Sequence, residues 1–207
     1  MEQQRSKAFF INGGAGRMLC SIPALEKYEQ ESGDKDFIIV CEGGTDMFKG
    51  HPTLDNRTYD IWHKGLFQEK LKDRDIVCPE PYRVWEYYNQ KCSLSQAFDI
   101  EINKKGIRDL PKPTLRLSKE ELLTGRKLVA DVKTKIKKDK VVVFQPFGRG
   151  IQHIDDSFVD PTSRSIEYKD MKAIIKRLQN AGYCVIMMTE FKMDLTQEKY
   201  SDEIAFP

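Results

Sequence analysis

The chain reads KAFFIN at residues 7–12 and GGAG at residues 13–16. A short apolar run of this kind indicates a buried strand, and the glycines after it indicate a tight turn. From Met18 to Leu25 the apolar residues then recur at the spacing of one helix face. A second buried strand is predicted from DFIIVC at residues 36–41. Strand, glycine loop, helix and strand in this order predict a right-handed βαβ unit within a parallel sheet.

The C-terminal half of the sequence repeats this order. SKEE at residues 118–121 is a capping box, which predicts a helix from there to about Lys138. VVVFQ at residues 141–145 predicts a buried strand that runs into PFGRG at residues 146–150. An amphipathic helix over 168–181 and a strand over 183–189 complete a second βαβ unit.

Weaker patterns fill the region between the two units. They predict short strands at 59–62 and 75–77, a helical turn or two over 66–71, and an aromatic-rich helix over 82–90. A long polar loop is expected after residue 150, and no strand is expected over 190–207.

The stretch 104–117, KKGIRDLPKPTLRL, combines two prolines and a glycine with charged residues, which is typical of a linker. We therefore predict an N-terminal domain over 1–110 and, over 111–207, a linker helix with the start of a second domain. That second domain holds few strands. Either the sequence is truncated, or it is naturally short, or these strands extend the first sheet.

The two βαβ units predict an α/β protein with Rossmann-like parallel sheets and flanking helices, and the composition agrees with a folded chain. Of its 207 residues, 40% are hydrophobic and 32% are charged, a balance that excludes a disordered chain. The 34 basic and 32 acidic residues give a net charge of +2, so no field for nucleic acid is expected. No apolar run reaches the roughly 20 residues of a membrane helix, and no signal peptide begins the sequence, so we expect a cytoplasmic protein.

The cysteine and histidine pattern predicts neither a metal site nor a disulfide framework. Five cysteines are widely spaced, and neither CxxC nor HExxH occurs. We expect all five thiols to be reduced and the protein to need no metal or other cofactor.

The loops after the first two strands carry the first candidate residues. Gly14 and Gly16 precede the predicted helix, where free backbone N–H groups suit an anion, and Arg17 adds a forked donor. Their alternatives are a plain tight turn and a surface arginine. Glu42 and Asp46 follow the second strand, at the sheet edge where open parallel sheets bind ligands.

His51, in Gly-His-Pro at residues 50–52, has the protonation chemistry of an acid or base. A structural loop histidine is the alternative for it, as a solvated loop carboxylate is for Glu42 and Asp46. The aromatic cluster within 82–90 has two interpretations as well, internal packing or a wall for a sugar ring.

The second unit repeats the arrangement of strand, glycine turn and basic residue. Gly148 and Arg149 follow the strand at 141–145, and Arg164 precedes the next helix. Arginine pairs well with phosphate oxygens, so both side chains are candidate contacts for a diphosphate. A solvated arginine is the alternative at each position.

Together these segments resemble a known family. Gly16 after the first strand, Pro-Ala-Leu at 23–25, Val40 with Glu42, and His-Pro-x-Leu-Asp at 51–55 are similar to the N-terminal domain of the lipopolysaccharide heptosyltransferases. VVVFQPFG at 141–148 and the stretch 168–190 resemble the start of that family's second domain. The resemblance covers most of the chain through short motifs.

The resemblance implies two Rossmann-like domains of the GT-B type, with the acceptor on the first and a nucleotide-diphosphate sugar on the second. It also implies metal-independent transfer with inversion in the closest relatives. One residue departs from the pattern. The family has an aspartate after the glycine turn, thought to be the base that activates the acceptor, whereas this chain has Arg17. A protonated guanidinium takes no proton. Glu42, Asp46 or His51 would then have to replace that aspartate, unless the chemistry differs or the protein is inactive.

The leading hypothesis from the sequence is glycosyl transfer from a nucleotide sugar to a glycan or other hydroxyl acceptor. The alternative is a non-catalytic module that binds a glycan or a protein partner, which the arginine at position 17 favours. A nucleotide-dependent oxidoreductase is a weaker hypothesis because the fingerprint G-x-G-x-x-G is missing.

Overall fold

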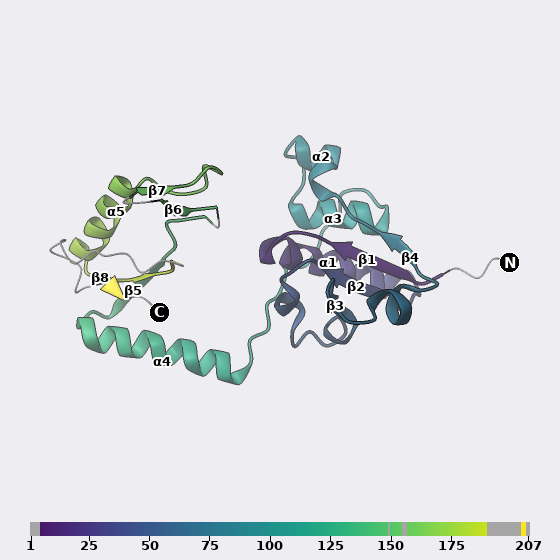
Figure 1. Ribbon diagram of the computed structural model, residues 1–207, viewed down its shortest axis with the longest axis horizontal. Coiled ribbons are helices and arrows are strands. Elements are labelled where there is room, and N and C mark those ends of the chain that lie inside the picture. Colours follow the sequence, from purple (N-terminus) through teal and green to yellow (C-terminus); the bar gives the residue numbers. More distant parts are fainter. Residues whose placement is uncertain (1–4, 149, 155–156, 190–203, 206–207) are drawn as a thin grey trace. The chain divides into compact units, whose positions relative to one another are not determined.

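A computed structural model describes residues 5–148, 150–154, 157–189 and 204–205 (Figure 1). Its elements in chain order are β1 (Lys7–Ile11), α1 (Ala15–Glu31), β2 (Ile38–Cys41), η1 (Thr45–Phe48), η2 (Asp55–Arg57), β3 (Thr58–Asp60), η3 (Leu66–Leu71), β4 (Asp75–Val77), η4 (Pro81–Arg83), α2 (Trp85–Tyr88), α3 (Leu94–Asn103), α4 (Lys119–Ile136), β5 (Lys140–Phe144), β6 (Gln152–Ile154), β7 (Ser157–Val159), α5 (Tyr168–Asn180), β8 (Tyr183–Met187) and β9 (Ile204–Ala205).

The chain divides into two compact units between Ser118 and Lys119. This division comes eight residues after the boundary expected from the sequence, because the proline-containing linker stays with the first unit. The first unit contains β1 to α3, and the second contains α4 to β9. Each unit is an α/β structure with its own sheet.

The first sheet has the strand order β3-β2-β1-β4, and all of its pairs are parallel. Phe9 lies level with Ile39 on one side and Val77 on the other. Successive side chains of a strand point to opposite faces, so β1 and β2 fill a core on both sides of the sheet.

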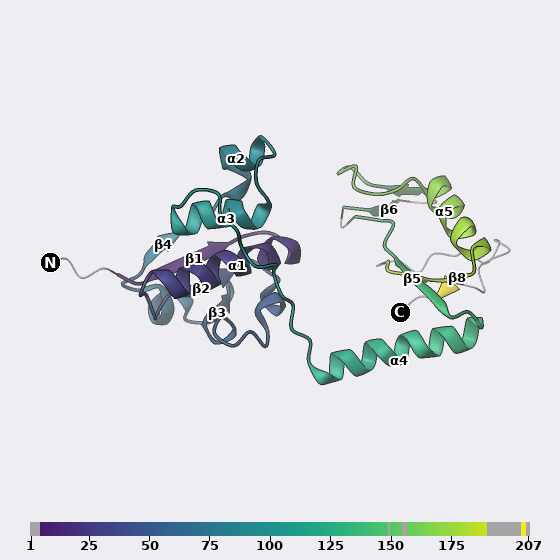
Figure 2. The ribbon, with the colours of Figure 1, turned by 180° about the vertical axis from the view of Figure 1, so that it is seen from behind.

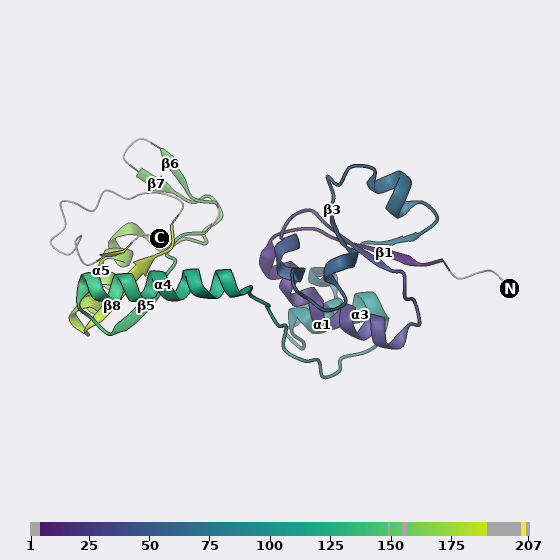
Figure 3. The same cartoon turned by 90° about the horizontal axis from the view of Figure 1, so that it is seen from below.

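Helices α1 and α3 cover one face of the first sheet, and η3 covers the other (Figures 2 and 3). The first core contains Phe9, Ile11 and Ile39 with Met18 and Leu25 of α1. A smaller core on the opposite face joins strand residues to both ends of η3, which is a π-helix; its buried members are Ala8, Ile38, Val40, Leu66 and Leu71.

The second unit is a three-layer structure. Its sheet has the order β5-β8-β9 with parallel pairing. On one face α5 contributes Met171 and Ile175 to a core with Val185. On the other face Val132 of α4 packs with Cys184. Figure 1 shows α4 and α5 on opposite sides of β5 and β8.

Most predicted elements are present, and the exceptions are short. The helix expected over 82–90 is broken into η4 and α2, because Val84 between them adopts an extended backbone. A capping box of Ser93 and Gln96 starts α3, a helix that was not among the elements predicted from the sequence. The loop expected after residue 150 contains the antiparallel pair β6–β7, and β9 lies within the region expected to hold no strand.

A half-buried carboxylate ties three element ends together at the amino edge of the first sheet. Asp34 accepts hydrogen bonds from Ser6 Oγ at 2.5 Å, from the amide of Lys7 at 2.9 Å and from Tyr28 Oη at 3.1 Å. Burial opposes ionisation, but these bonds and one from the Asp36 amide hold its pKa below the ordinary value. Burial and then the charge of Asp34 raise the pKa of Tyr28 to about 12.

A buried histidine fixes the connection between β2 and β3. His51 is 7% exposed. Its Nδ1 accepts hydrogen bonds from the amides of Thr53 at 3.3 Å and Leu54 at 3.1 Å, so the ring proton lies on Nε2. That nitrogen lies 3.0 Å from Glu26 Oε1 of α1. The connection is thereby anchored to the helix.

The Asp34 contacts predict a pH-dependent contribution to stability. Asp34→Asn should lower the free energy of unfolding by about 1–2 kcal/mol at pH 7, since it weakens charge-assisted hydrogen bonds that solvent partly screens. The pKa of Asp34 is lower in the folded than in the unfolded protein. The ionised carboxylate therefore stabilises the fold above about pH 4, and this contribution is lost as the pH falls through the folded-state pKa. Urea unfolding should show a smaller difference in the free energy of unfolding between wild type and Asp34→Asn at pH 3 than at pH 7. The same difference at both pH values would contradict this prediction.

The His51 contacts predict a structural cost of its removal. His51→Ala should destabilise the first unit by roughly 2–3 kcal/mol, because two amides and a carboxylate lose their partner in a buried place. His63→Ala, at an exposed ring that packs edge-on against Tyr59, should cost less than about 1 kcal/mol. Thermal unfolding of both variants tests this, and equal melting temperatures would show that the His51 bonds contribute little.

Candidate functional site

The carboxyl ends of the parallel strands bring several loops of the first unit to one edge. The amide of Glu42, just after β2, donates to the carbonyl of Ile11 at the end of β1 at 3.3 Å. The amide of Ile61, after β3, donates to Cys41 at 2.9 Å. Open parallel sheets bind their ligands at this edge, because loops from neighbouring strands meet there.

Two glycines allow the loops of this edge to approach closely. Gly13 and Gly44 have positive φ angles of 98° and 70°. A Cβ at Gly44 would lie 3.0 Å from Met18 Cγ and 3.2 Å from the Cα of Ala15, so the loop after β2 packs against the start of α1. A side chain at either position would be strained and crowded.

Gly14 and Gly16, unlike Gly13 and Gly44, are not needed for close packing of the loops. A Cβ at either position would meet nothing within 4 Å, and both residues are exposed. Gly14 is the N-cap of α1 and supplies no side-chain cap, and the first turn contains no acidic residue. The positive end of the helix dipole is therefore uncovered at this edge.

Arg17 is held firmly within the first unit. Its Nη2 donates to the carbonyl of Pro79 at 3.0 Å and to Glu80 Oε1 at 3.2 Å. The guanidinium carbon lies 5.1 Å from the ring centre of Tyr82 and 5.8 Å from that of Phe98. Its side chain is only 12% exposed, and its Nε is buried with no partner among the described residues. These contacts favour a positioning part for Arg17 over direct contact with a diphosphate.

Glu80 is a carboxylate of this edge that the sequence analysis did not select. It follows β4, the neighbour of β1, and its side chain is 39% exposed beside Arg17. The only sequence sign was its position three residues after the short predicted strand at 75–77. No sequence pattern indicates that Glu80 pairs with Arg17, because the two residues are 63 positions apart.

The three residues expected to take a proton occupy different environments. Glu42 is exposed at the edge, and Asp46 lies in η1 with a side chain that is 81% exposed and 4.0 Å from Lys49 Nζ. Both carboxylates are open to a ligand. Both ring nitrogens of His51 are engaged inside the protein, which favours a structural part for it.

In the second unit a turn packs tightly on the loop after β5. A Cβ at Gly148 would lie 2.8 Å from Arg164 Cβ, and the Gly148 amide donates to Ser165 Oγ at 3.0 Å. Asp160 holds this turn by accepting from Ser165 Oγ at 2.6 Å and from the Arg164 amide at 3.1 Å. Hydrogen bonds from Ser165 and then Thr162 lower the pKa of Asp160 to about 2.

This packing brings Arg164 next to Gly148 at the carboxyl edge of the second sheet. The Ile166 amide donates to the Pro146 carbonyl at 2.9 Å, so α5 begins beside the end of β5. The Arg164 residue is exposed. Arg149, the third residue expected here, lies outside the described residues.

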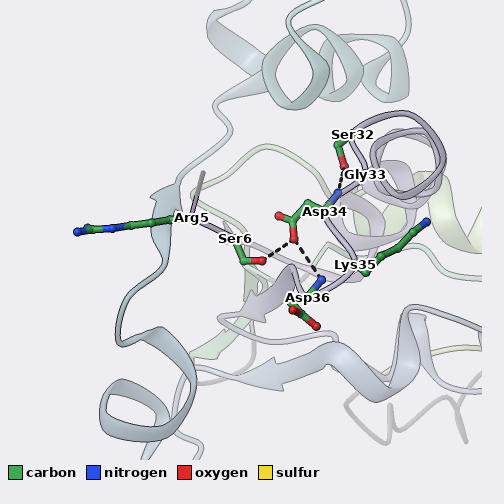
Figure 4. A pocket seen from close by; sticks show the side chains of 7 residues that line it. All are labelled: Arg5, Ser6, Ser32, Gly33, Asp34, Lys35 and Asp36. Carbon is green, nitrogen blue, oxygen red and sulfur yellow. Dashed lines mark hydrogen bonds between the residues drawn. The ribbon is translucent and has the colours of Figure 1, made fainter. Parts of the chain in front are cut away.

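Two hollows of the first unit lie at the amino edge of its sheet, away from these loops. One of about 350 Å³ is lined by Ser6, Gly33, Asp34 and their neighbours at the amino edge of the sheet (Figure 4). Another of about 410 Å³ lies between the starts of β2 and β3. Figure 4 shows Asp34 bonded to Ser6 and the Asp36 amide, so this carboxylate is used in holding the fold.

The described residues contain neither a cluster of metal ligands nor a membrane-spanning helix. Within them, no three His, Cys, Asp or Glu residues come together as a metal ion would require. No helix in the same part of the chain has the length and apolarity needed to span a membrane.

No protein-family model matches the sequence, and no curated protein matches it. Solved structures do match. A family 9 glycosyl transferase from Veillonella parvula DSM 2008 is similar over 90% of this chain and 64% of its own, at 10% identity and a TM-score of 0.57. E. coli heptosyltransferase WaaC with ADP is similar over 98% of this chain and 74% of its own, at 12% identity and a TM-score of 0.54.

A third match is the iron-containing dodecameric glycosyltransferase TibC from enterotoxigenic E. coli H10407. It is similar over 92% of this chain and 43% of its own, at 13% identity and a TM-score of 0.53. The chain thus spans less than two thirds of the length of the Veillonella protein and of TibC. At these identities the likeness is one of fold: the chain has the mixed α/β, parallel-sheet fold of GT-B glycosyltransferases, heptosyltransferases among them.

Proposed function

We propose that the protein transfers a sugar from a nucleotide-diphosphate sugar to a hydroxyl acceptor. The observation that carries this proposal is the carboxyl edge of the first sheet, where an uncapped glycine-rich helix start lies beside open carboxylates. The glycosyltransferase fold of the matched structures supports it. Heptosyl or hexosyl transfer is the finer form of the proposal, and it rests on the sequence resemblance.

The acceptor is proposed to bind to the first unit. Gly14 and Gly16 leave room above the start of α1, and the carboxylates of Glu42 and Asp46 can accept hydrogen bonds from acceptor hydroxyls. Tyr82, next to Arg17, is 47% exposed, and Trp85 and Tyr88 of α2 are 60% and 80% exposed. Ring faces that are open to solvent suit the apolar face of a sugar.

The donor is proposed to bind to the second unit. Gly148 and Arg164 lie together where β5 ends and α5 begins, and Arg149 follows in the sequence. A nucleoside diphosphate is the leaving group, so the negative charge that develops on it would be stabilised by arginine and by the start of a helix. The proposal includes metal-independent transfer and a cytoplasmic location, which the sequence led us to expect.

Turnover is the direct test of this function. The full chain, incubated with UDP-, GDP- and ADP-linked sugars with and without glycan acceptors, should release the nucleoside diphosphate from at least one donor. Luminescent detection of the free nucleotide measures this. A chain that releases none from any donor yet binds glycans on an array would instead be the non-catalytic binding module, which is the alternative that the arginine at position 17 favours.

The donor contacts predict a loss of affinity in variants of the second unit. Arg164→Ala should weaken binding of the matching nucleoside diphosphate by about 1.5 kcal/mol or more, roughly tenfold, because a charge-assisted hydrogen bond is lost. Adding Arg149→Ala should weaken it further. Arg177→Ala, in the last turn of α5, is the matched control and should leave calorimetric affinity unchanged. If all three variants bind the nucleoside diphosphate as tightly as the wild-type protein, these donor contacts are ruled out.

A further inference from the structure

A fixed cation orients one carboxylate at the carboxyl edge of the first sheet. Arg17 lies over the rings of Tyr82 and Phe98 and donates to Pro79 and Glu80 through the same nitrogen. Its alkyl stem lies against Gly13, where a Cβ would be only 3.2 Å from its Cδ. The guanidinium therefore has little freedom, and it holds Glu80 Oε1 in one place.

Neither Glu42 nor Asp46 has such an orienting group among the described residues. No hydrogen bond or ion pair to the Glu42 carboxylate is found within the described residues, and Asp46 has only the exposed Lys49 amine at 4.0 Å. The side chain of Glu80 is 39% exposed and so accessible to an acceptor, while its partner Arg17 is only 12% exposed and so fixed in place. A general base is effective when a third group fixes its orientation toward the proton that it takes.

We propose that Glu80 takes the proton of the acceptor hydroxyl during glycosyl transfer and that Arg17 is its positioning residue. This inference rests on the proposed function. In the step, the acceptor oxygen forms a bond to the anomeric carbon as the bond from that carbon to the diphosphate oxygen breaks. The electron pair of the broken bond leaves with the diphosphate, and the hydroxyl proton passes to a Glu80 oxygen.

The reaction does not need a strong base. Glycosyl transfer goes through an oxocarbenium-like transition state, and the attacking hydroxyl becomes strongly acidic as its oxygen bonds to the electron-poor carbon. A correctly oriented carboxylate is then sufficient. Glu42 would remain a binding group for the acceptor.

The test measures donor turnover by the full chain with the donor and acceptor that it uses. Glu80→Gln should lower kcat at least 100-fold, within the range of general-base catalysis, with the KM values changed less than threefold. Glu42→Gln should instead raise the KM for the acceptor. Glu69→Gln, on η3 at the opposite face of the sheet, is the matched control and should behave as wild type.

Two further readouts separate a base from a structural residue. Sodium formate should restore turnover to Glu80→Gly but not to Glu42→Gly, because a small carboxylate can fill the vacated place. Arg17→Met should lower kcat and leave the KM values little changed, and Arg17→Lys should keep more of the turnover, because a cation still orients Glu80.

If Glu80→Gln keeps turnover within threefold of wild type, the assignment of Glu80 as the base is overturned, while the proposed function stands. Loss of turnover with a lowered melting temperature and no rescue by formate would also overturn it, in favour of a structural part. Absence of turnover in the wild-type chain would overturn the proposed function, and this assignment with it.

Discussion

The parallel pairing of β1 with both β2 and β4 determines where every candidate group of the first unit lies. Since the three strands run in the same direction, the glycine turn, the loop of Glu42 and the segment of Glu80 all follow strand ends at one edge. Side chains distant in sequence then meet, as Arg17 meets Glu80. Had β4 paired in the antiparallel sense, Glu80 would lie at the opposite edge, away from the glycine turn.

Close packing of backbone segments adds precision to this arrangement. The absence of a side chain at Gly13 leaves room for the alkyl stem of Arg17, and at Gly44 it leaves room for the start of α1. Both loops therefore approach the helix more closely than a side chain would permit. The second unit uses the same device, with Gly148 against Arg164 and Gly150 against Thr162. In both units the glycines that matter for packing are distinct from Gly14 and Gly16, which leave space uncovered.

The strands and long helices were predictable because burial imposes a pattern on neighbouring residues. The apolar runs at 7–11, 38–41, 140–144 and 183–187 each form a strand, and the periodic stretch at 168–180 forms a helix. The break at Val84 and the antiparallel pair β6–β7 were not predictable, because local turn geometry decides the structure there and leaves no periodic pattern in the sequence. Of the site, the edge itself could be predicted, but the long-range partners of Arg17 and His51 could not, because ion pairs between distant residues have no sequence periodicity.

In the proposed reaction, the acceptor binds at the carboxyl edge of the first sheet and the donor binds at the carboxyl edge of the second sheet. A crystal structure of the full chain soaked with the nucleoside diphosphate of its donor tests this most directly. We expect the diphosphate beside Gly148 and Arg164, at the start of α5. Density instead in the hollow around Asp34, at the amino edge of the first sheet, would contradict the account.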